Sequence, residues 1–192
     1  MKMLVSEYIR VLNIALNGPS QYATGAFGAP TGYKNNTERY AKNSSAAVAK
    51  KIRECADGTF MFDCKGYIVM PLWGWSADPN ALYGGAVYKG NDVPDFSIKS
   101  IQKHCSDWKE DGCPQSALTV GEWMRTKEKD HVGVYAGAGM VLNSTARGDC
   151  KVQLTKLSDR DWSGHGKSIY IEYPEKKPEI VCPCCGARFI LE

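Results

Sequence analysis

The spacing of apolar positions predicts three helices in the first third of this chain. Between residues 4 and 17 apolar side chains recur every three to four residues, which is the period of an amphipathic helix. A second helix is expected at about 44–56, where small apolar residues precede a pair of lysines. A short third helix should begin at Cys64, because Asp63 is a good N-cap residue, and Pro71 should end it.

Alternating apolar and polar positions predict strands in the second half of the chain. We expect these strands near 122–125, 131–136, 139–143, 150–155 and 168–173. Residues 74–118 are rich in Gly, Asp, Pro and Asn, which predicts an irregular connection with one helix near 97–108. Helices packed on a small antiparallel sheet make an α+β domain.

Length and tail composition predict one domain with a short appendage. A chain of 192 residues fits a single domain, and Pro174–Pro178 combines two prolines with charged residues, as linkers do. We therefore expect a domain over 1–173, followed by a linker and a Cys-rich tail over 174–192. The oligomeric state has no signature in the sequence.

Charge and hydropathy narrow the choice of partner and compartment. The formal net charge is +3, and Lys and Arg are dispersed along the sequence. This mild positive charge suits binding to an anionic cell envelope, but it is much weaker than the clustered basic surface of a nucleic-acid-binding protein. Glu7 and Arg10 interrupt the first apolar run, so neither a secretory signal nor a membrane span is predicted. Synthesis in a reducing cytoplasm is then expected, with the eight cysteines as thiols or metal ligands.

Cysteines in the tail suggest half of a zinc site. Cys182 and Cys185 have the spacing of one zinc-ribbon knuckle, but structural zinc normally takes four ligands and a second knuckle is absent. His104, Cys105 and Cys113 could complete the set only if the fold brought them close. The alternative is a thiol-rich tail without metal.

Three residues supply the parts of a thiol-hydrolase centre: a nucleophile, a base and an orienting group. Cys64 would face the unpaired N–H groups and positive end of a helix, which predicts a lowered thiol pKa. His131 opens a strand, and Asn143 follows twelve residues later on the returning strand. The structural alternatives are a buried Cys, a strand His and a turn Asn.

The loop between the two strands decides whether His131 and Asn143 can meet. A three-residue loop at 136–138 would place them directly opposite on one face, with Cβ atoms about 5 Å apart. A two-residue loop would send them to opposite faces. His165 is the alternative base, but its glycine neighbours predict a loop.

These motifs resemble the NlpC family of papain-like cell-wall peptidases. The family signature is Asp-Cys-Ser-Gly, then His-Val-Gly-Ile-Tyr, then a polar residue twelve positions after the His. The matching segments here are Asp63-Cys64-Lys65-Gly66, His131-Val132-Gly133-Val134-Tyr135 and Asn143, with weaker likeness at Gln21–Gly25, Gly121–Met124 and, to phage lysins, Leu157–Tyr173. The resemblance spans about residues 4–173, with gaps, and its combined pattern is more specific than any piece.

The resemblance implies a papain-like fold, no cofactor for catalysis, and peptidoglycan as substrate. It further implies hydrolysis of the bond between D-γ-glutamate and the diamino acid of the stem peptide. Tyr22 and Asp63 would contact the N-terminal part of the stem, and Lys65 and Trp123 are further candidates for substrate contacts. Lys65 replaces the usual Ser and places a long cation beside the thiol.

Two rival functions remain open from the sequence. An N-acetylmuramoyl-L-alanine amidase would use the same three residues. A non-catalytic wall- or zinc-binding module would have Cys64 and His131 apart, so their separation tests that alternative. A wall-cutting enzyme without a signal must also leave the cytoplasm by another route. A phage endolysin released by a holin reconciles these expectations.

Overall fold

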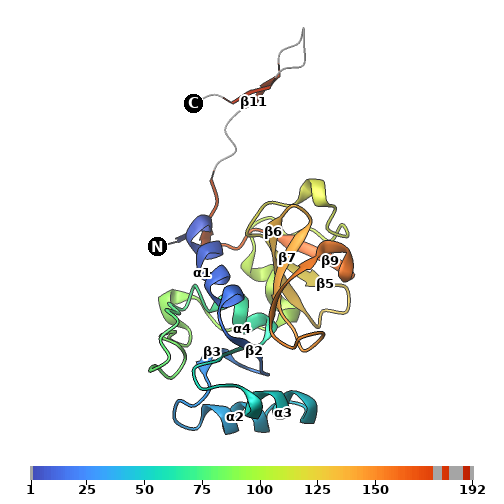
Figure 1. The fold of residues 1–192 in the computed structure, drawn as a ribbon. Coiled ribbons are helices and arrows are strands. Elements are labelled where there is room, and N and C mark those ends of the chain that lie inside the picture. Colours follow the sequence, from blue (N-terminus) through green and yellow to red (C-terminus); the bar gives the residue numbers. More distant parts are fainter. Residues whose placement is uncertain (1, 175–178, 182–187, 191–192) are drawn as a thin grey trace.

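The computed structural model describes residues 2–174, 179–181 and 188–190. Its largest sheet has five antiparallel strands in the order β8-β7-β6-β5-β9 (Figure 1). The strands are β5 (Trp123–Thr126), β6 (Val132–Gly137), β7 (Met140–Ser144), β8 (Val152–Lys156) and β9 (Trp162–Gly166). With the helices below, this confirms an α+β architecture built on a small antiparallel sheet.

Four α-helices accompany this sheet: α1 (Val5–Asn17), α2 (Asn36–Lys42), α3 (Ala46–Glu54) and α4 (Cys64–Val69). Helices α1, α3 and α4 confirm the three predicted from the sequence, whereas α2 was not predicted. Asp63 caps α4 as expected, since its side chain accepts a hydrogen bond from the Gly66 N–H. The connection after α4 contains 3₁₀ turns at Gly90–Asp92, Ile98–His104 and Gln115–Ala117, and another turn lies at Leu157–Asp159.

Short strands build the remaining sheets, and all of them except β10 were missing from the sequence prediction. A three-stranded sheet has the order β2-β4-β3, and β1 pairs with β10 while β11 pairs with β12. Their bounds are β1 (Met3–Leu4), β2 (Ser20–Tyr22), β3 (Phe27–Pro30), β4 (Phe60–Phe62), β10 (Ile171–Glu172), β11 (Glu179–Val181) and β12 (Arg188–Ile190). Segments of two to four residues are too short to show alternation, and β3 and β4 are buried at every position.

The prediction of a last strand at 168–173 is wrong. The fifth strand is β9, which pairs with β5, and only Ile171–Glu172 of the predicted segment is a strand, in a separate pair. Two glycines hid β9 from the sequence pattern. They are needed because the Trp108 ring lies over this strand: a Cβ at Gly164 would come within 2.4 Å of that ring.

The main core lies where α1 and α4 meet the five-stranded sheet, with α4 central in the molecule (Figure 1). The Tyr8 hydroxyl of α1 donates to the Ile68 carbonyl of α4 at 2.7 Å, and the Tyr67 hydroxyl of α4 donates to the Leu12 carbonyl at 3.0 Å. Because these polar atoms are buried, each bond satisfies a group that would otherwise be costly to bury. Helix α4 is thereby held in one position against α1.

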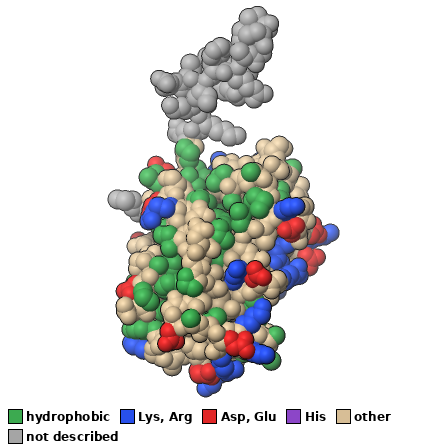
Figure 2. All heavy atoms as spheres, in the orientation of Figure 1, with side chains coloured by type: hydrophobic (Ala, Val, Ile, Leu, Met, Phe, Trp, Pro, Cys, Tyr) green, Lys and Arg blue, Asp and Glu red, His purple; other side chains and the backbone are tan. Residues whose placement is uncertain are grey.

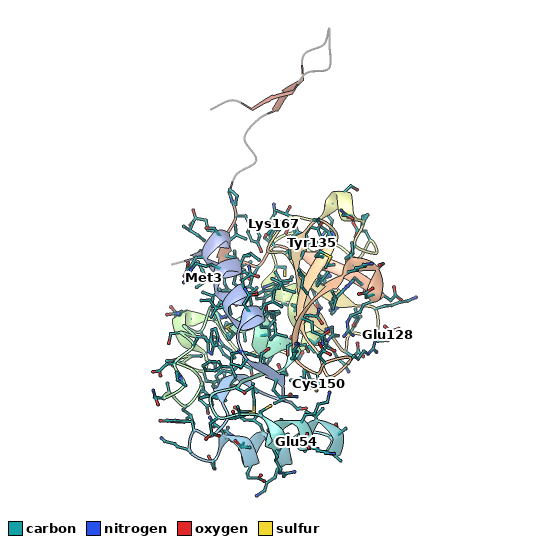
Figure 3. The ribbon with its side chains drawn as sticks, in the orientation of Figure 1. Met3, Glu54, Glu128, Tyr135, Cys150 and Lys167 are labelled. Atoms are coloured by element: carbon teal, nitrogen blue, oxygen red, sulfur yellow. The ribbon has the colours of Figure 1, made fainter. Side chains whose placement is uncertain are left out.

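A second core joins α2 and α3 to the opposite end of the sheet. Cys150, in the β7–β8 connection, belongs to one buried cluster with Val48 and Ile52 of α3 (Figure 3). The Tyr22 N–H donates to the Cys150 carbonyl at 2.7 Å, which ties β2 to the same connection. Strand β2, which pairs with β4 just before α4, is therefore fastened to the β7–β8 connection.

Charged side chains of both signs are interspersed on the face drawn in Figure 2. None of the helices in the part of the chain that the structure describes is both long and apolar enough to cross a membrane.

Candidate active site

Cys64 is the first residue of α4, one residue beyond Asp63, which follows the end of β4, and is only 6% exposed. The Phe62 carbonyl at this junction accepts hydrogen bonds from the Ala23 N–H at 3.0 Å and from the Ser144 hydroxyl at 2.9 Å. Ser144 is the last residue of β7, the strand that carries Asn143. The backbone before the thiol is therefore fastened to the strand that carries the predicted orienting amide.

Asp63 shapes the turn into α4. One carboxylate oxygen accepts from the Gly66 N–H and the other from the Gly25 N–H, the latter at 2.9 Å. Gly66 allows the close approach, because a Cβ there would lie 1.9 Å from the Ala26 carbonyl oxygen. Burial raises the pKa of Asp63. Asp63 thus has a structural role in the turn, besides its predicted contact with substrate.

His131 and Asn143 are joined by a hydrogen bond of 3.1 Å between His131 Nε2 and Asn143 Oδ1. The Asn143 amide nitrogen donates to Thr155 Oγ1 at 2.9 Å and to the Val141 carbonyl at 3.3 Å, which fixes its oxygen toward the ring. An amide oxygen can only accept, so Nε2 carries the proton and Nδ1 holds the free lone pair. In papain-like chemistry this lone pair is the proton acceptor for the thiol.

The predicted register of this pair is wrong by two residues, although the predicted common face is correct. Val134 lies opposite Leu142 and Tyr135 opposite Val141, which places Gly133 opposite Asn143. His131 therefore meets Asn143 along the diagonal, a separation that long side chains can bridge. A Cβ at Gly133 would lie 2.7 Å from Val141 and 3.0 Å from the Trp162 ring, so glycine leaves room for that ring beside His131.

Burial favours the neutral forms of Cys64 and His131. It raises the pKa of the Cys64 thiol to about 12, and the Asp63 charge adds to the rise, while the N–H groups of Val132, Lys65 and Cys64 oppose it. Burial also lowers the pKa of His131 to about 4, assisted by the Arg160 charge. The predicted lowering of the thiol pKa is wrong, because desolvation outweighs the helix N-terminus. The Val132 contact places the sulfur beside the start of β6, next to His131.

A cavity of about 370 Å³ adjoins the start of α4. Asp63 and Lys65 line it, together with the aromatic side chains Phe27, Tyr40, Trp73, Tyr83 and Tyr88. Lys65 forms an ion pair with Asp95, and Asp95 also accepts from the Tyr88 hydroxyl at 2.7 Å. The cation that replaces the usual Ser is therefore neutralised by a carboxylate inside this cavity.

Tyr22 and Trp123, two further predicted substrate contacts, differ in position. Tyr22 is half-buried, and its pKa is raised to about 12 by burial and by the negative charges of Cys64 and Asp63, which places it near the thiol. Trp123 is 0% exposed, and its Nε1 donates to the Tyr8 hydroxyl at 2.9 Å. The prediction for Trp123 is therefore wrong: the side chain belongs to the core and cannot touch substrate.

His165 lies in β9, and the loop predicted for it is wrong. Its Nδ1 lies 2.6 Å from Glu122 Oε2 and its Nε2 lies 3.2 Å from Asp111 Oδ1. The side chain is 2% exposed and faces a carboxylate with each ring nitrogen. Each ring nitrogen lies beside a carboxylate and not beside a thiol, which argues against His165 as the base.

The predicted zinc ligands Cys182 and Cys185 lie outside the described residues. Within residues 2–174, 179–181 and 188–190, no three His, Cys, Asp or Glu side chains are grouped closely enough to hold a metal ion. His104 instead pairs its Nδ1 with the Tyr170 hydroxyl at 2.9 Å. The suggested partners His104, Cys105 and Cys113 do not assemble among themselves.

Residues near the centre that sequence reasoning missed include Thr145, Arg160 and Trp162. The Trp162 ring centroid is 5.8 Å from that of His131, and Arg160 Nη2 donates to Thr145 Oγ1 at 2.7 Å. Arg160 and Trp162 fall in the segment that resembles phage lysins, which was the one available signal. Nothing in their spacing connects them with His131.

No protein-family model matches the sequence, and the comparison with curated proteins finds no match. Solved structures with a similar backbone include the peptidoglycan hydrolase RipB from Mycobacterium tuberculosis, at 18% identity and a TM-score of 0.49 over 88% of this chain and 65% of that one. The P60 domain of a Mycobacterium avium subspecies paratuberculosis antigen matches at 16% identity and a TM-score of 0.48, over 86% of this chain and 94% of the domain.

A third similar structure is the resuscitation promoting factor interacting protein RipA mutated at E444, at 19% identity and a TM-score of 0.47, over 88% of this chain and 62% of that chain. This chain thus spans less than two thirds of RipB and of RipA. Because the likeness is this remote, function has to be inferred from the side chains of the site.

Proposed function

We propose that this chain is a cysteine hydrolase that cuts an amide bond in the stem peptide of peptidoglycan. The observation that supports it most is the His131–Asn143 hydrogen bond, held beside a thiol at the start of a helix. A nucleophile, a base and a group that orients the base are the three parts that amide hydrolysis by a thiol requires. The sequence motifs around these residues resemble those of cell-wall peptidases and supply the substrate class.

The reaction starts from a neutral thiol and a neutral imidazole. His131 Nδ1 accepts the thiol proton as the Cys64 sulfur attacks the amide carbonyl, and Asn143 keeps the ring in the required tautomer. The Cys64 N–H at the start of α4 stabilises the oxyanion. His131 then gives its proton to the leaving amine, and water releases the acyl group from sulfur in a second step.

The bond that we propose joins D-γ-glutamate to the diamino acid, and Tyr22 contacts the part of the stem that is retained on the thioester. This assignment rests on the motif resemblance and on the position of Tyr22 near the thiol. The alternative bond, between muramic acid and L-alanine, would be cut by the same three residues. Its products differ in mass and in the identity of the new amino terminus.

The test is mass spectrometry of fragments released from purified peptidoglycan. Wild-type protein and Cys55→Ala, a control at a partly exposed thiol outside the site, should both release fragments with a new amino terminus on the diamino acid. Cys64→Ala should release none while keeping its thermal stability. A new amino terminus on L-alanine would establish the amidase instead, and equal release by Cys64→Ala would refute the thiol mechanism.

We further propose that the enzyme acts as an endolysin, made in the cytoplasm and released to the wall by a holin. The support is the likeness of Leu157–Tyr173 to the closing segment of phage lysins. Expression in a bacterium with a susceptible wall should leave growth intact until a holin is co-expressed, and lysis should then follow. Lysis without the holin, or no lysis with it, would contradict this role.

A further inference from the structure

Arg160 is a half-buried cation that the proposed mechanism does not use. Its Nη2 donates to Thr145 Oγ1 at 2.7 Å, and the same oxygen accepts the Arg147 backbone N–H at 3.2 Å. Among the described residues, no ion pair includes Arg160 or Arg147. A partly desolvated guanidinium without a carboxylate partner is costly to maintain unless a ligand supplies the anion.

The neighbours of Arg160 place it on the His131 side of the reacting centre. Thr145, which accepts its hydrogen bond, directly follows β7 and lies two residues beyond Asn143. Trp162, two residues further along the chain, packs its ring 5.8 Å from the His131 ring. The Arg160 charge also contributes to the lowered pKa of His131, and the Cys64 thiolate acts in turn on the pKa of Arg160.

Two acidic groups near this position, Asp130 and Asp159, already accept hydrogen bonds. Asp130 accepts from the Thr126 hydroxyl at 2.7 Å, and Asp159 accepts from the Lys156 N–H at 3.0 Å. Arg147 adds a second positive charge that acts on both His131 and Arg160. The surroundings of the base therefore carry cations that internal carboxylates do not neutralise by direct contact.

A hollow of about 560 Å³ lies beside Arg160. Arg160, Lys156, Trp162 and the acidic residue Asp161 are among the residues that line it. It is distinct from the cavity beside Asp63 and Lys65. A ligand in this hollow would meet two cations, one carboxylate and the indole ring that packs beside His131.

The proposed proton transfer from His131 decides which part of the substrate lies near Arg160. His131 protonates the leaving amine, so the leaving fragment must sit on the side of the base, while the acyl fragment stays on the sulfur. We propose that Arg160 is a specificity-determining residue that binds a carboxylate of the leaving fragment. This inference rests on the proposed function and assigns Arg160 a role that the catalytic residues do not fill.

The inference predicts discrimination between two kinds of diamino acid. A diaminopimelate residue carries a carboxylate at the end of its side chain, and a lysine residue at the same position does not. A guanidinium recognises a carboxylate through two parallel hydrogen bonds, which a lysine side chain cannot accept. Wild-type enzyme should therefore cleave a diaminopimelate-containing stem peptide with a kcat/KM about 10- to 100-fold higher than its lysine counterpart.

The experiment measures kcat and KM for two synthetic stem peptides that differ only in that residue. Arg160→Gln should lose the 10- to 100-fold preference by slowing the diaminopimelate peptide, with the lysine peptide unchanged. Arg160→Lys should restore part of the preference, because it keeps the charge without the planar fork. Arg53→Gln is the matched control, an exposed arginine that pairs with Glu38 on the surface.

Each outcome decides the matter. Equal cleavage of both peptides by wild-type enzyme would overturn the role of Arg160 while leaving the hydrolase intact. An equal loss on both peptides in Arg160→Gln, with Arg160→Lys no better, would show a structural role and also overturn it. No cleavage of either peptide by wild-type enzyme would refute the proposed function itself, and this inference with it.

Discussion

Two buried histidines on one sheet show what separates a catalytic base from a structural side chain. His131 is 7% exposed and is held by the neutral amide of Asn143 through one nitrogen only. His165 is 2% exposed and lies between the carboxylates of Glu122 and Asp111. An amide orients the His131 ring through one nitrogen and leaves the second nitrogen free, whereas a carboxylate lies beside each nitrogen of His165.

The comparison is tested most strongly by removing each ring in turn. His131→Ala should lower kcat by at least about 1000-fold, since the residue acts as a unit with the nucleophile. His165→Ala should leave turnover per folded molecule unchanged but destabilise the fold by about 3–5 kcal/mol, because Glu122 would remain buried without a partner.

Kinetics normalised to folded protein, together with denaturant unfolding, separates the two effects. If His165→Ala lost turnover and His131→Ala kept it, the roles assigned to the two rings would have to be exchanged.

Asn143 should matter less than His131 but more than an ordinary polar residue. Asn143→Ala should lower turnover about 10- to 1000-fold, because packing against Trp162 still restrains the ring. Asn143→Asp should retain more activity than alanine, since a carboxylate accepts the same hydrogen bond. Asn143→Asp should also raise the pKa of His131, because a neighbouring carboxylate favours the imidazolium. Near-wild-type turnover in Asn143→Ala would remove it from the site.

The pH profile distinguishes a neutral His131 from an ordinary histidine. With a pKa of about 4, the base stays unprotonated on acidification, so kcat/KM should remain level to about pH 5 and halve near pH 4. An ordinary histidine would give a midpoint near 6.5. In Asn143→Asp the midpoint should move upward. A wild-type midpoint at or above 6.5 would show that burial does not set the protonation of this ring.

The lowered pKa of His131 also makes the free energy of unfolding depend on pH. The unfolded chain binds a proton at His131 below about pH 6.5 and the folded protein only below about 4, so stability falls as the pH drops through that interval. The loss should reach about 3 kcal/mol and then level off. His131→Ala should remove it, and unfolding measured from pH 7 to 4 in both proteins gives the difference. Parallel curves would contradict the assignment.

The smallest predicted effect concerns the glycine between the two strands. Gly133→Ala would push a methyl group against Val141 and Trp162, at a cost of about 1–3 kcal/mol in stability. A loss of turnover beyond that expected from unfolding should accompany it, because Trp162 packs beside His131. Unchanged stability would mean that the strand pair can spread without cost.

Sequence periodicity predicted the parts of the fold whose pattern is long enough to repeat. Helices α1 and α3 and the strands β5 to β8 agree with the prediction within a few residues. Strands β2, β3 and β4 are too short to show a period, and β9 contains glycines because Trp108 lies over Gly164. That contact crosses more than fifty residues of sequence, so no local pattern could reveal it.

For the candidate site too, local sequence signals were predictive, whereas properties that depend on distant contacts were not. Local signals placed Asp63 at the helix cap and put His131 and Asn143 on one face, as the hydrogen bonds bear out. Two properties depend on burial and could not be foreseen: the raised pKa of Cys64 and the core position of Trp123. Arg160 was missed because it approaches the base from a segment without regular spacing.

The most direct measurement is the labelling of the wild-type protein with a stem-peptide fragment that ends in an electrophile at the scissile position. Peptide mapping by mass spectrometry then locates the adduct. The account predicts one adduct on Cys64, formed at least about 1000-fold more slowly in His131→Ala and at the wild-type rate in His165→Ala. An adduct on another residue, or equal rates with and without His131, would contradict it.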